Sequence, residues 1–297
     1  MSVFLGVDTG GTYTDAVLLD DAAGQVLASA KALTSRPDLS LGIGGAIDAV
    51  LADAPQIAPA EIGLVSLSTT LATNALVEGQ GTRAALVVIG FAPADIARAG
   101  LAEALGDDPL IALAGGHTHA GTEAVPFDSE ALERALSALP PGISALAVAG
   151  QFATRNPAHE NAARALIRAR TGLPVTCSHE LSAGLNGPKR ALTALLNARL
   201  VGMIDRLVTA CETHVAARGI KAPLMVVRGD GALVSAALVR ERPIETILSG
   251  PAASIAGAAW LTGLSDALVS DIGGTTTDVC LLRDGRPAID PEGARVG

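Results

Sequence analysis

Short apolar runs alternate along the chain with longer segments in which apolar residues recur at helical spacing. The short runs are bounded by turn-forming residues, as is typical of buried strands. The pattern predicts strands over residues 3–7, 16–19, 64–68, 84–89, 145–149, 224–227, 267–270 and 279–282. It predicts helices over residues 39–53, 129–138, 158–171 and 190–218. Strands that alternate with helices in this way indicate an α/β fold.

The longest predicted helix lies within residues 181–219 and carries an apolar stripe. We interpret the stripe as core packing; its members are Leu192, Leu195, Leu196, Leu200, Met203 and Leu207. No long linker or low-complexity tract interrupts the chain. We expect a first composite domain over residues 1–180 and the start of a second domain over residues 181–297.

The composition indicates a globular chain with an aliphatic core. Hydrophobic residues make up 49% of the chain, charged residues 17% and aromatic residues only 2%. The formal net charge of −9 argues against nucleic-acid binding, which needs a basic surface. Three widely separated cysteines and a start without a basic signal region predict a cytoplasmic protein with reduced thiols. The uncharged stretch 247–265 contains Ser, Gly and Pro, so we expect a buried, close-packed helix instead of a membrane span.

One motif occurs twice. Residues 8–15 read DTGGTYTD, and residues 271–278 read DIGGTTTD, 263 positions later. Over residues 8–19 and 271–282 the two copies share eight of twelve positions. Each copy follows one apolar run and leads into another, so both predict a strand, a glycine turn and a second strand. Two copies in the same context indicate a duplicated architecture.

The residue types of the repeat suit phosphate and metal binding. Paired glycines bring backbone N–H groups close to a phosphate, and threonine hydroxyls add hydrogen bonds. An aspartate at the end of a buried strand is a hard oxygen ligand for Mg²⁺ and also orients a nucleophile. Asp-x-Gly-Gly-Thr is also an ordinary tight-turn sequence, but that interpretation explains one copy better than it explains two.

The paired loops resemble the phosphate 1 and phosphate 2 motifs of the actin, sugar kinase and Hsp70 superfamily. Further segments are similar to the hydantoinase A and 5-oxoprolinase family: residues 68–79 (STTLATNALVEG), 186–193 (NGPKRALT) and 248–253 (LSGPAA). The resemblance covers essentially the whole chain and implies a ribonuclease H-like, actin/Hsp70-type ATPase fold. Members of the family are much longer, which implies an amino-terminal fragment with a truncated second half and an incomplete nucleotide site.

The family implies an ATP-dependent enzyme that phosphorylates the carbonyl of a cyclic amide or imide, of hydantoin or 5-oxoproline type, so that water opens the ring. A ketone carboxylase subunit or a kinase on the same fold is one alternative, and a non-catalytic nucleotide-binding assembly module is another. The flanking segments favour ring opening. The resemblance also implies ATP and Mg²⁺ as cofactors, a hydantoinase B-type partner subunit and a homo- or hetero-oligomer. We expect this fragment alone to be inactive.

By position in the motifs, the resemblance implies roles for residues of both loops. Asp8 and Asp271 are the expected catalytic residues and hold Mg²⁺ through water. The expected phosphate contacts are Thr9, Gly10, Gly11, Thr12, Gly273, Gly274, Thr275 and Thr276. We also expect Thr70 and Asn74 to contact the substrate, because a hydroxyl and an amide suit a lactam or imide edge.

Two other polar patterns leave alternatives open. His117 and His119 form an H-x-H pair that, with Glu123, suits zinc, although a polar loop is the simpler interpretation. Lys189 and Arg190 lie at the start of the long helix, where a cation is unfavourable unless it faces an anion. That position is either a functional basic site or a solvated helix face.

Overall fold

The computed structural model describes residues 3–35, 37–77, 79, 81–272 and 277–288. Contacts between Cα atoms divide the chain into two units. Unit 1 combines residues 1–80 with residues 204–297, and unit 2 is the inserted segment 81–203. The domain boundary expected after residue 180 falls inside unit 2, and the division into two family-type domains stays a prediction.

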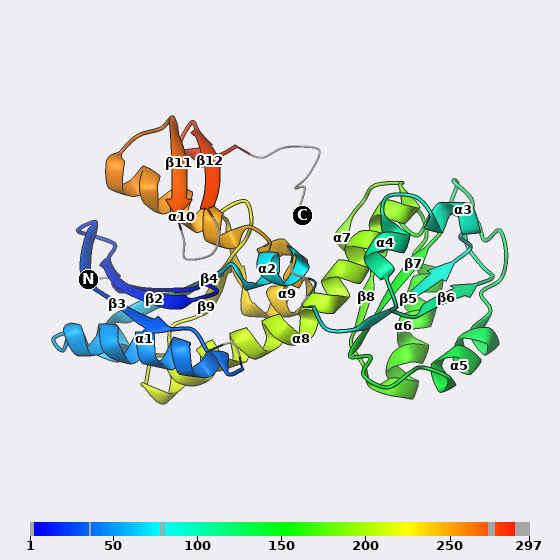
Figure 1. Ribbon diagram of the computed structural model, residues 1–297, viewed down its shortest axis with the longest axis horizontal. Coiled ribbons are helices and arrows are strands. Elements are labelled where there is room, and N and C mark those ends of the chain that lie inside the picture. The colour runs from blue at the N-terminus through cyan, green and yellow to red at the C-terminus, as the bar shows by residue number, and fades with distance from the viewer. Residues whose placement is uncertain (1–2, 36, 78, 80, 273–276, 289–297) are drawn as a thin grey trace. The chain divides into compact units, whose positions relative to one another are not determined.

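Unit 1 is built on a six-stranded mixed sheet with the strand order β10-β9-β4-β1-β2-β3 (Figure 1). Strands β1, β2 and β3 form an antiparallel meander, whereas β4 pairs with β1 and β9 in parallel. The bounds are Val3–Thr9 (β1), Tyr13–Asp20 (β2), Gln25–Leu33 (β3), Ile62–Thr69 (β4), Leu224–Val227 (β9) and Leu233–Ser235 (β10). The first copy of the repeated motif forms the predicted hairpin between β1 and β2.

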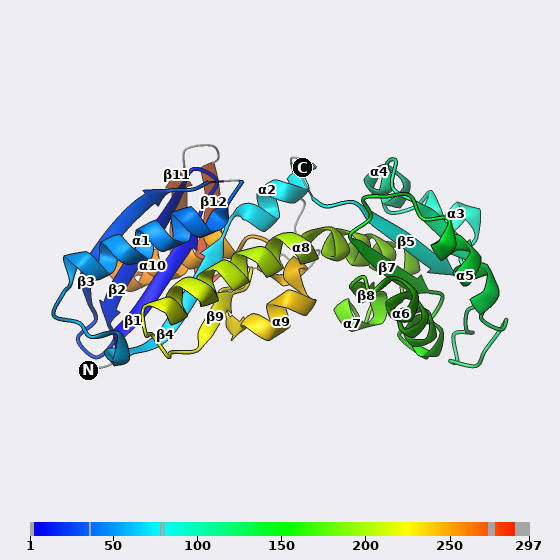
Figure 2. The same cartoon turned by 90° about the horizontal axis from the view of Figure 1, so that it is seen from below.

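Every second residue of β1 is buried, which directs one face of the strand into the core. Helix α1 (Leu39–Asp53) contacts β1, β2 and β3, and the Asp38 side chain caps its start. Figure 2 shows α1 beside the second half of α8 (Gly187–Ala217). A Cβ atom on Gly44 of α1 would lie 2.5 Å from the His214 ring of α8. The two helices therefore pack this closely only because residue 44 is glycine.

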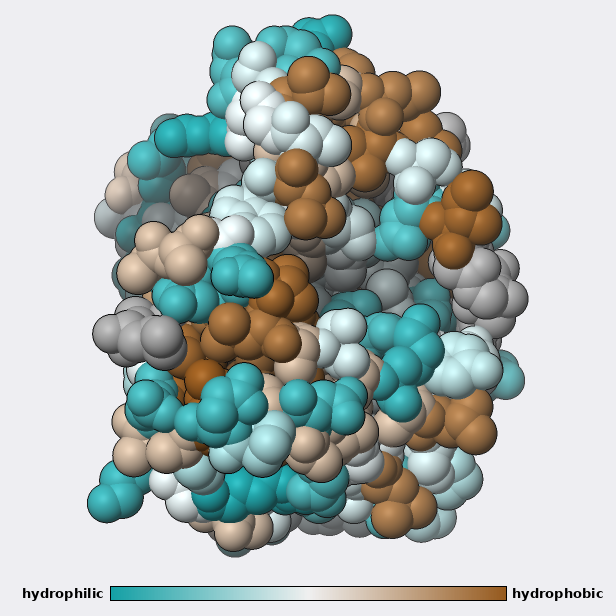
Figure 3. All heavy atoms as spheres, turned by 90° about the vertical axis from the view of Figure 1, so that its left-hand side faces the viewer, coloured by the Kyte–Doolittle hydropathy of each residue, from teal (hydrophilic) through white to brown (hydrophobic). Residues whose placement is uncertain are grey.

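A smaller sheet follows helix α10 (Ser249–Thr262). Its strands β11 (Ala267–Ile272), β12 (Thr277–Arg283) and β13 (Arg286–Pro287) are antiparallel, and β11 and β12 carry the first and last residues of the second motif copy. One face of this sheet presents apolar side chains, because Leu268 is 72% exposed and Ile272 is 77% exposed. Figure 3 shows hydrophobic side chains, in brown, over the upper part of this side of unit 1, where Figure 1 places α10 and β11.

Helix α10 is the helix expected within residues 247–265, but only its first half is buried. Its buried residues lie between Ser249 and Ile255, whereas Trp260 and Leu261 are 47% and 72% exposed. The expectation of a buried helix therefore holds only for the first half of α10. In the described part of the chain, no helix combines the length and apolar character that a membrane crossing needs.

Unit 2 contains a four-stranded parallel sheet with the order β6-β5-β7-β8. The bounds are Ala84–Ile89 (β5), Leu110–Leu113 (β6), Ala145–Gly150 (β7) and Val175–Cys177 (β8). The central strands β5 and β7 are buried along their whole length, as strands between two helix layers are. Helices α5 (Ser129–Ser137) and α6 (Ala158–Thr171) cover one face. Helix α4 (Leu101–Leu105) and the first half of α8 cover the other.

Four further α-helices of the described residues are short, in addition to 3-10 helices at Pro59–Glu61 and Pro243–Thr246. They are α2 (Leu71–Val77) and α9 (Ala236–Glu241) in unit 1 and α3 (Pro93–Ile96) and α7 (Ser178–Leu181) in unit 2. The mixed sheet of unit 1 and the parallel sheet of unit 2 confirm the α/β class. The actin/Hsp70-type ATPase fold stays a prediction.

Candidate functional site

The first copy of the repeated motif forms a tight hairpin between β1 and β2. Asp8 pairs with Asp15 across the hairpin, and the Gly10 N–H donates a hydrogen bond to the Tyr13 carbonyl at 2.9 Å. A Cβ atom on Gly10 would lie 3.0 Å from that carbonyl oxygen and 4.0 Å from the Thr70 hydroxyl. The turn therefore favours glycine at position 10, and Thr70 lies directly beside it.

Asp8 is held at the end of β1 by the neighbouring strand β4. The parallel register places Ser68 opposite Asp8, and the Ser68 hydroxyl donates to Oδ1 of Asp8 at 2.6 Å. Burial raises the pKa of Asp8, the Ser68 hydrogen bond opposes the shift, and the charges of Asp15 and Asp271 add to it. A cation beside Asp8 would therefore stabilise its ionised form.

Asp271 occupies the equivalent position in the second copy. It lies on β11 opposite Asp278 of β12, and the Ser254 hydroxyl of α10 donates to its Oδ2 at 2.6 Å. Burial raises the pKa of Asp278, and the charge of Asp271 adds to the shift. Because Asp271 also raises the pKa of Asp8, the two repeated aspartates lie within electrostatic reach of each other in unit 1.

The end of β4 and the start of α10 meet next to Thr70. The Ser249 hydroxyl donates to the Thr69 carbonyl at 2.9 Å and accepts a hydrogen bond from the Thr69 N–H at 3.3 Å. A Cβ atom on Gly250 would lie 2.6 Å from Cγ2 of Thr70. A serine and a glycine at the start of α10 thus let the helix approach the end of β4, which carries Ser68, and Thr70, which follows it.

The other predicted site residues do not all share this location. Thr9 is fully buried on the face of β1 opposite to Asp8, so its side chain is turned away from the candidate site. Gly11 is half-buried and Thr12 is exposed at the tip of the hairpin. Asn74 lies half-buried in α2. The remaining expected phosphate contacts lie outside the described residues: Gly273, Gly274, Thr275 and Thr276.

The structure does not bring Glu123, the third expected zinc ligand, to both histidines of the H-x-H pair. His117 is buried with its ring centroid 4.2 Å from that of His159, whereas His119 is exposed. Glu123 Oε1 pairs with Nε2 of His159 at 2.8 Å, and the Gly116 N–H donates to Nδ1 of the same ring at 3.0 Å. Because Nδ1 accepts, Nε2 carries the proton and donates to Glu123. The polar-loop interpretation therefore fits this segment.

A buried cluster in unit 2 has the side chains of a metal site, but hydrogen bonds already occupy it. Glu160, Cys177 and His179 place potential ligand atoms within 4.8 Å of one another. Glu160 Oε1 accepts from the Gly150 N–H at 2.7 Å and from the Ser178 hydroxyl at 2.6 Å, and Oε2 pairs with Nδ1 of His179. Burial raises the pKa of Cys177 to about 12, so its thiol stays protonated. The cluster therefore holds β7, α6 and α7 together.

Arg190 of α8 belongs to the same network and is only 2% exposed. Its Nη2 donates to the Gly150 carbonyl at 2.9 Å, and its Nη1 donates to the Gly184 carbonyl at 2.7 Å. Burial lowers the pKa of Arg190, and the nearby Glu160 carboxylate opposes this shift. The solvated-face interpretation is wrong for Arg190, because the side chain points into unit 2 and ties α8 to β7.

The sequence does not predict the two serine hydroxyls that donate hydrogen bonds to Asp8 and Asp271. Ser68 ends a predicted strand, and a parallel pairing of that strand with β1 would have placed it opposite Asp8. Ser254 gave no such signal, because a serine within a helix has many ordinary roles. Its contact with Asp271 follows only from the packing of α10 on β11.

Two family models match the chain. The N-terminal region of hydantoinase/oxoprolinase matches residues 4–171, and hydantoinase/oxoprolinase matches residues 190–297. The alpha subunit of caprolactamase from Pseudomonas jessenii is 29% identical and aligns with 95% of this chain and 44% of its own length. The gamma subunit of acetophenone carboxylase from Aromatoleum aromaticum is 27% identical and aligns with 96% of this chain and 44% of its own length. The chain thus spans less than half of these relatives.

Two solved structures share the fold. A nucleotide-free acetone carboxylase superimposes with a TM-score of 0.82 at 22% identity, over 99% of this chain and 46% of that chain. The ATP-dependent caprolactamase from Pseudomonas jessenii superimposes with a TM-score of 0.75 at 27% identity, over 94% of this chain and 43% of that chain. Both matches extend over units 1 and 2.

Proposed function

The chain belongs to the hydantoinase/oxoprolinase family, and from this premise we propose that it is the nucleotide-binding part of a cytoplasmic, ATP-dependent hydrolase of cyclic amides or imides. ATP phosphorylates the ring carbonyl, and water then opens the activated ring. The substrate class rests on the caprolactamase relatives, one of which is described as ATP-dependent.

One observation carries the proposal: the two copies of the repeated motif bring two aspartates within electrostatic reach in unit 1. Asp8 and Asp271 each accept a hydrogen bond from a serine hydroxyl at 2.6 Å. Two carboxylates in mutual repulsion favour a cation between them and the phosphates that the cation accompanies. The glycine turn after Asp8 supplies the close backbone approach that a phosphate needs.

The proposed reaction balances with ATP and water alone. The amide carbonyl oxygen attacks the γ-phosphorus of ATP, the bond to the bridging oxygen breaks, and ADP leaves with the electron pair. Water adds to the activated ring carbon, and the C–N bond breaks as the nitrogen takes up a proton. A second water releases phosphate from the resulting acyl phosphate. The products are ADP, phosphate and the ring-opened amino acid.

Residues of unit 1 have distinct roles in this scheme. The backbone N–H group of Gly11 binds a phosphate oxygen, because the Gly10 N–H already donates to the Tyr13 carbonyl. Thr70 contacts the substrate side of the site. Asp8 and Asp271 are the residues that would hold Mg²⁺, which would supply positive charge beside the phosphates. The fit is supported by the chemistry of the donor set, since carboxylates are the hard oxygen ligands that Mg²⁺ prefers.

A ketone carboxylase subunit is the second candidate function. The acetophenone and acetone carboxylase relatives align over 96% and 98% of this chain, much as the caprolactamase does. A ketone, through its enolate oxygen, attacks phosphorus in the same way as an amide carbonyl. The relatives are named as alpha, beta or gamma subunits, which supports a hetero-oligomer with a hydantoinase B-type partner.

Two measurements test the proposal. Titration calorimetry of the assembled enzyme with MgATP tests the nucleotide site, and ATP-dependent release of phosphate with ε-caprolactam in the same enzyme tests the reaction. We expect Asp271→Asn to lower lactam-dependent turnover by about 100-fold or more, because it removes one anion from the metal and phosphate site.

The matched control is Asp266→Asn, which removes the same charge from an exposed position just before β11. This variant should bind MgATP and turn over as the unmodified protein does. Equal loss in both variants would refute a specific role for Asp271. Turnover with acetophenone and none with caprolactam would instead favour the carboxylase.

A further inference from the structure

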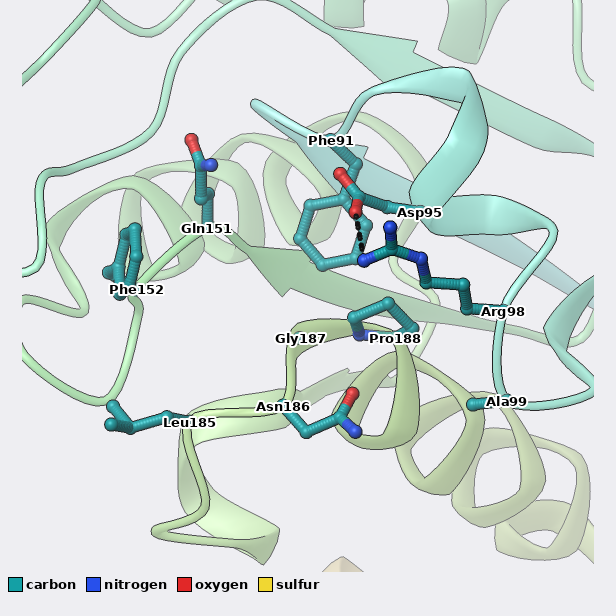
Figure 4. Close-up of a pocket in the computed structure, with 10 residues that line it drawn as sticks. All are labelled: Phe91, Asp95, Arg98, Ala99, Gln151, Phe152, Leu185, Asn186, Gly187 and Pro188. Atoms are coloured by element: carbon teal, nitrogen blue, oxygen red, sulfur yellow. Dashed lines mark ion pairs between the residues drawn. The ribbon is translucent and has the colours of Figure 1, made fainter.

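Unit 2 contains a pocket of about 590 Å³, within the range of roughly 300–1,000 Å³ that is typical of small-molecule sites. Figure 4 shows the residues that line it. They come from three segments: the chain after β5, the chain after β7 and the start of α8. Apolar walls include the rings of Phe91 and Phe152, and the side-chain amides of Gln151 and Asn186 are uncharged polar groups in the lining.

The pocket lies at the switch point of the parallel sheet. Strands β5 and β7 are neighbours, but β6 lies beyond β5 on one side and β8 lies beyond β7 on the other. The chain after β5 leads to α4 on one face of the sheet, and the chain after β7 leads to α6 on the opposite face. Open α/β sheets bind ligands at such points, outside the carboxyl ends of the strands. Phe91 and Gln151 lie immediately beyond those two ends.

The backbone around the pocket is strained and close-packed. Ala99 and Phe152 have left-handed φ angles of 57° and 53°, which are unfavourable for residues other than glycine. Such strain persists at ligand sites where the surrounding structure enforces it. Gly187 at the start of α8 lies against Phe91, since a Cβ atom there would be 3.0 Å from Cζ of the ring. Any side chain at position 187 would therefore press on the Phe91 wall.

The polar groups of the pocket suit an uncharged ligand. Asp95 and Arg98 form an ion pair at 3.6 Å, so their charges offset each other. The start of α8 is capped internally, because the Lys189 and Arg190 N–H groups donate to the Asn186 side chain and carbonyl, and Pro188 has no N–H. The capping role of Oδ1 leaves Nδ2 of Asn186 as a donor, while the Gln151 amide offers both a donor and an acceptor.

We propose that this pocket binds the neutral cyclic amide itself, with its ring methylenes between Phe91 and Phe152 and its N–H and C=O edge at Gln151 and Asn186. This assignment rests on the proposed function for the substrate class and adds a lactam-binding site in unit 2 to the substrate contacts expected at Thr70 and Asn74 of unit 1. It predicts preference for a lactam over an anionic ring acid, because no unpaired cation of the described lining faces such a ligand.

Direct binding to the 297-residue chain, without nucleotide, tests the assignment. Titration calorimetry and saturation-transfer NMR are run with ε-caprolactam, N-methylcaprolactam, acetophenone and 5-oxoproline as probes. We expect caprolactam to bind, N-methylcaprolactam to bind about ten-fold more weakly because it lacks the N–H donor, and 5-oxoproline to bind weakly or not at all. Stronger binding of acetophenone or 5-oxoproline than of caprolactam would overturn the proposal.

Three variants locate the binding. Gly187→Ala should push the Phe91 ring into the pocket, Gln151→Met should remove the amide but keep the chain length, and Phe152→Gly should remove a wall at a position where glycine relieves strain. Each should weaken caprolactam binding about ten-fold with MgATP binding unchanged. The control Gly257→Ala adds a methyl to a helix where nothing lies within 4 Å and should leave caprolactam binding unchanged.

Melting temperatures of all the variants show whether a loss of binding reflects unfolding. Unchanged caprolactam affinity in folded Phe152→Gly and Gln151→Met would refute the pocket. If the chain binds MgATP but not caprolactam, the pocket assignment fails alone. If it binds caprolactam at this pocket but the assembled enzyme releases no phosphate from ATP in response to caprolactam, the proposed nucleotide-dependent function fails instead.

Discussion

Asp8 is an acid in a position that disfavours its charge. Between the ordinary carboxyl pKa and the raised pKa of Asp8, the folded chain holds a proton that the unfolded chain has lost. The free energy of unfolding therefore falls as the pH rises through this window, and the stabilising contribution of Asp8 is fully present only below it. A site that weakens the fold at neutral pH is consistent with selection for binding instead of stability.

We therefore expect Asp8→Asn to raise the melting temperature at pH 7 and at the same time to weaken MgATP binding by about ten-fold or more. The amide keeps the shape of the side chain and can still accept from Ser68, but it carries no charge for the cation. Calorimetry with and without MgATP measures both effects. A melting temperature that falls would contradict the sign of the pKa shift.

The control is Asp15→Asn, which removes a like charge from the paired position on β2. It should lower the pKa of Asp8, because the charge of Asp15 helps to raise it. The loss of MgATP affinity on acidification should then begin at a lower pH, while the affinity at neutral pH stays close to that of the unmodified chain. No movement of that onset would show that another group controls it.

The residues at the candidate site differ in how well the sequence predicted them. The repeated motif singles out Asp8, Gly10 and Asp271, and the structure brings the two aspartates within electrostatic reach; their roles stay predictions. The position of Thr9 in the motif predicts a phosphate contact, but strand alternation turns its side chain into the core. Arg190 was misjudged because the charge pattern of α8 gives no sign of the carbonyls that its guanidinium contacts.

At the scale of elements, the start of α10 joins the two halves of the candidate site, because it contacts Thr69 and Thr70 and carries Ser254 to Asp271. The helix contains two glycines in opposite surroundings. A Cβ atom on Gly250 would lie 2.6 Å from Thr70, whereas one on Gly257 would meet nothing within 4 Å. Substitutions at these two positions therefore distinguish the space that glycine provides from its low helix propensity.

We expect Gly257→Ala to raise the free energy of unfolding by about 0.5–1 kcal/mol, as alanine does in an open helix position. Gly250→Ala should lower it by about 1–3 kcal/mol, because the methyl group overpacks against Thr70. It should also weaken MgATP binding, whereas Gly257→Ala should not. Chemical denaturation and titration calorimetry measure these changes, and equal effects of the two substitutions would rule out a close approach of α10 to β4.

The predicted strands and long helices were found close to their expected bounds, because each carries a continuous apolar run or stripe. The strands that the sequence missed lack this signal. Strand β3 is exposed on an edge and contains Ala, Ser and Lys, while β6, β8 and β10 contain only three or four residues. Their pairing depends on neighbours that are distant in sequence, which no local pattern records.

At the scale of the whole molecule, the division into two units has no signal in the composition. One crossing between the units lies at residues 80 and 81, and the other lies at residues 203 and 204, inside the uninterrupted helix α8. A boundary within a helix has no Gly, Pro or polar linker to mark it. The boundary predicted from the sequence therefore lies after residue 180, before α8.

Because each unit has its own buried sheet, we expect two transitions in scanning calorimetry. Gly44→Ala should shift one of them down, since the new methyl would meet His214 within unit 1. Arg190→Leu should shift the other down, because it leaves two carbonyls and Glu160 without their cation in unit 2. The free energy of unfolding of unit 2 should fall by about 3 kcal/mol or more. A single transition that responds to both substitutions would show that the units unfold together.

Trp260 is the only tryptophan of the chain, and it lies half-exposed on α10, with Gly24 of the β2–β3 turn nearby. Fluorescence excited selectively at tryptophan therefore reports on α10. The start of this helix contacts Thr70, and its Ser254 donates a hydrogen bond to Asp271. If MgATP draws the two aspartates together, the emission of Trp260 should change in wavelength or intensity, and Asp271→Asn should abolish the response. The scarcity of aromatic residues thus leaves this chain a single tryptophan, on a helix that contacts the candidate nucleotide site.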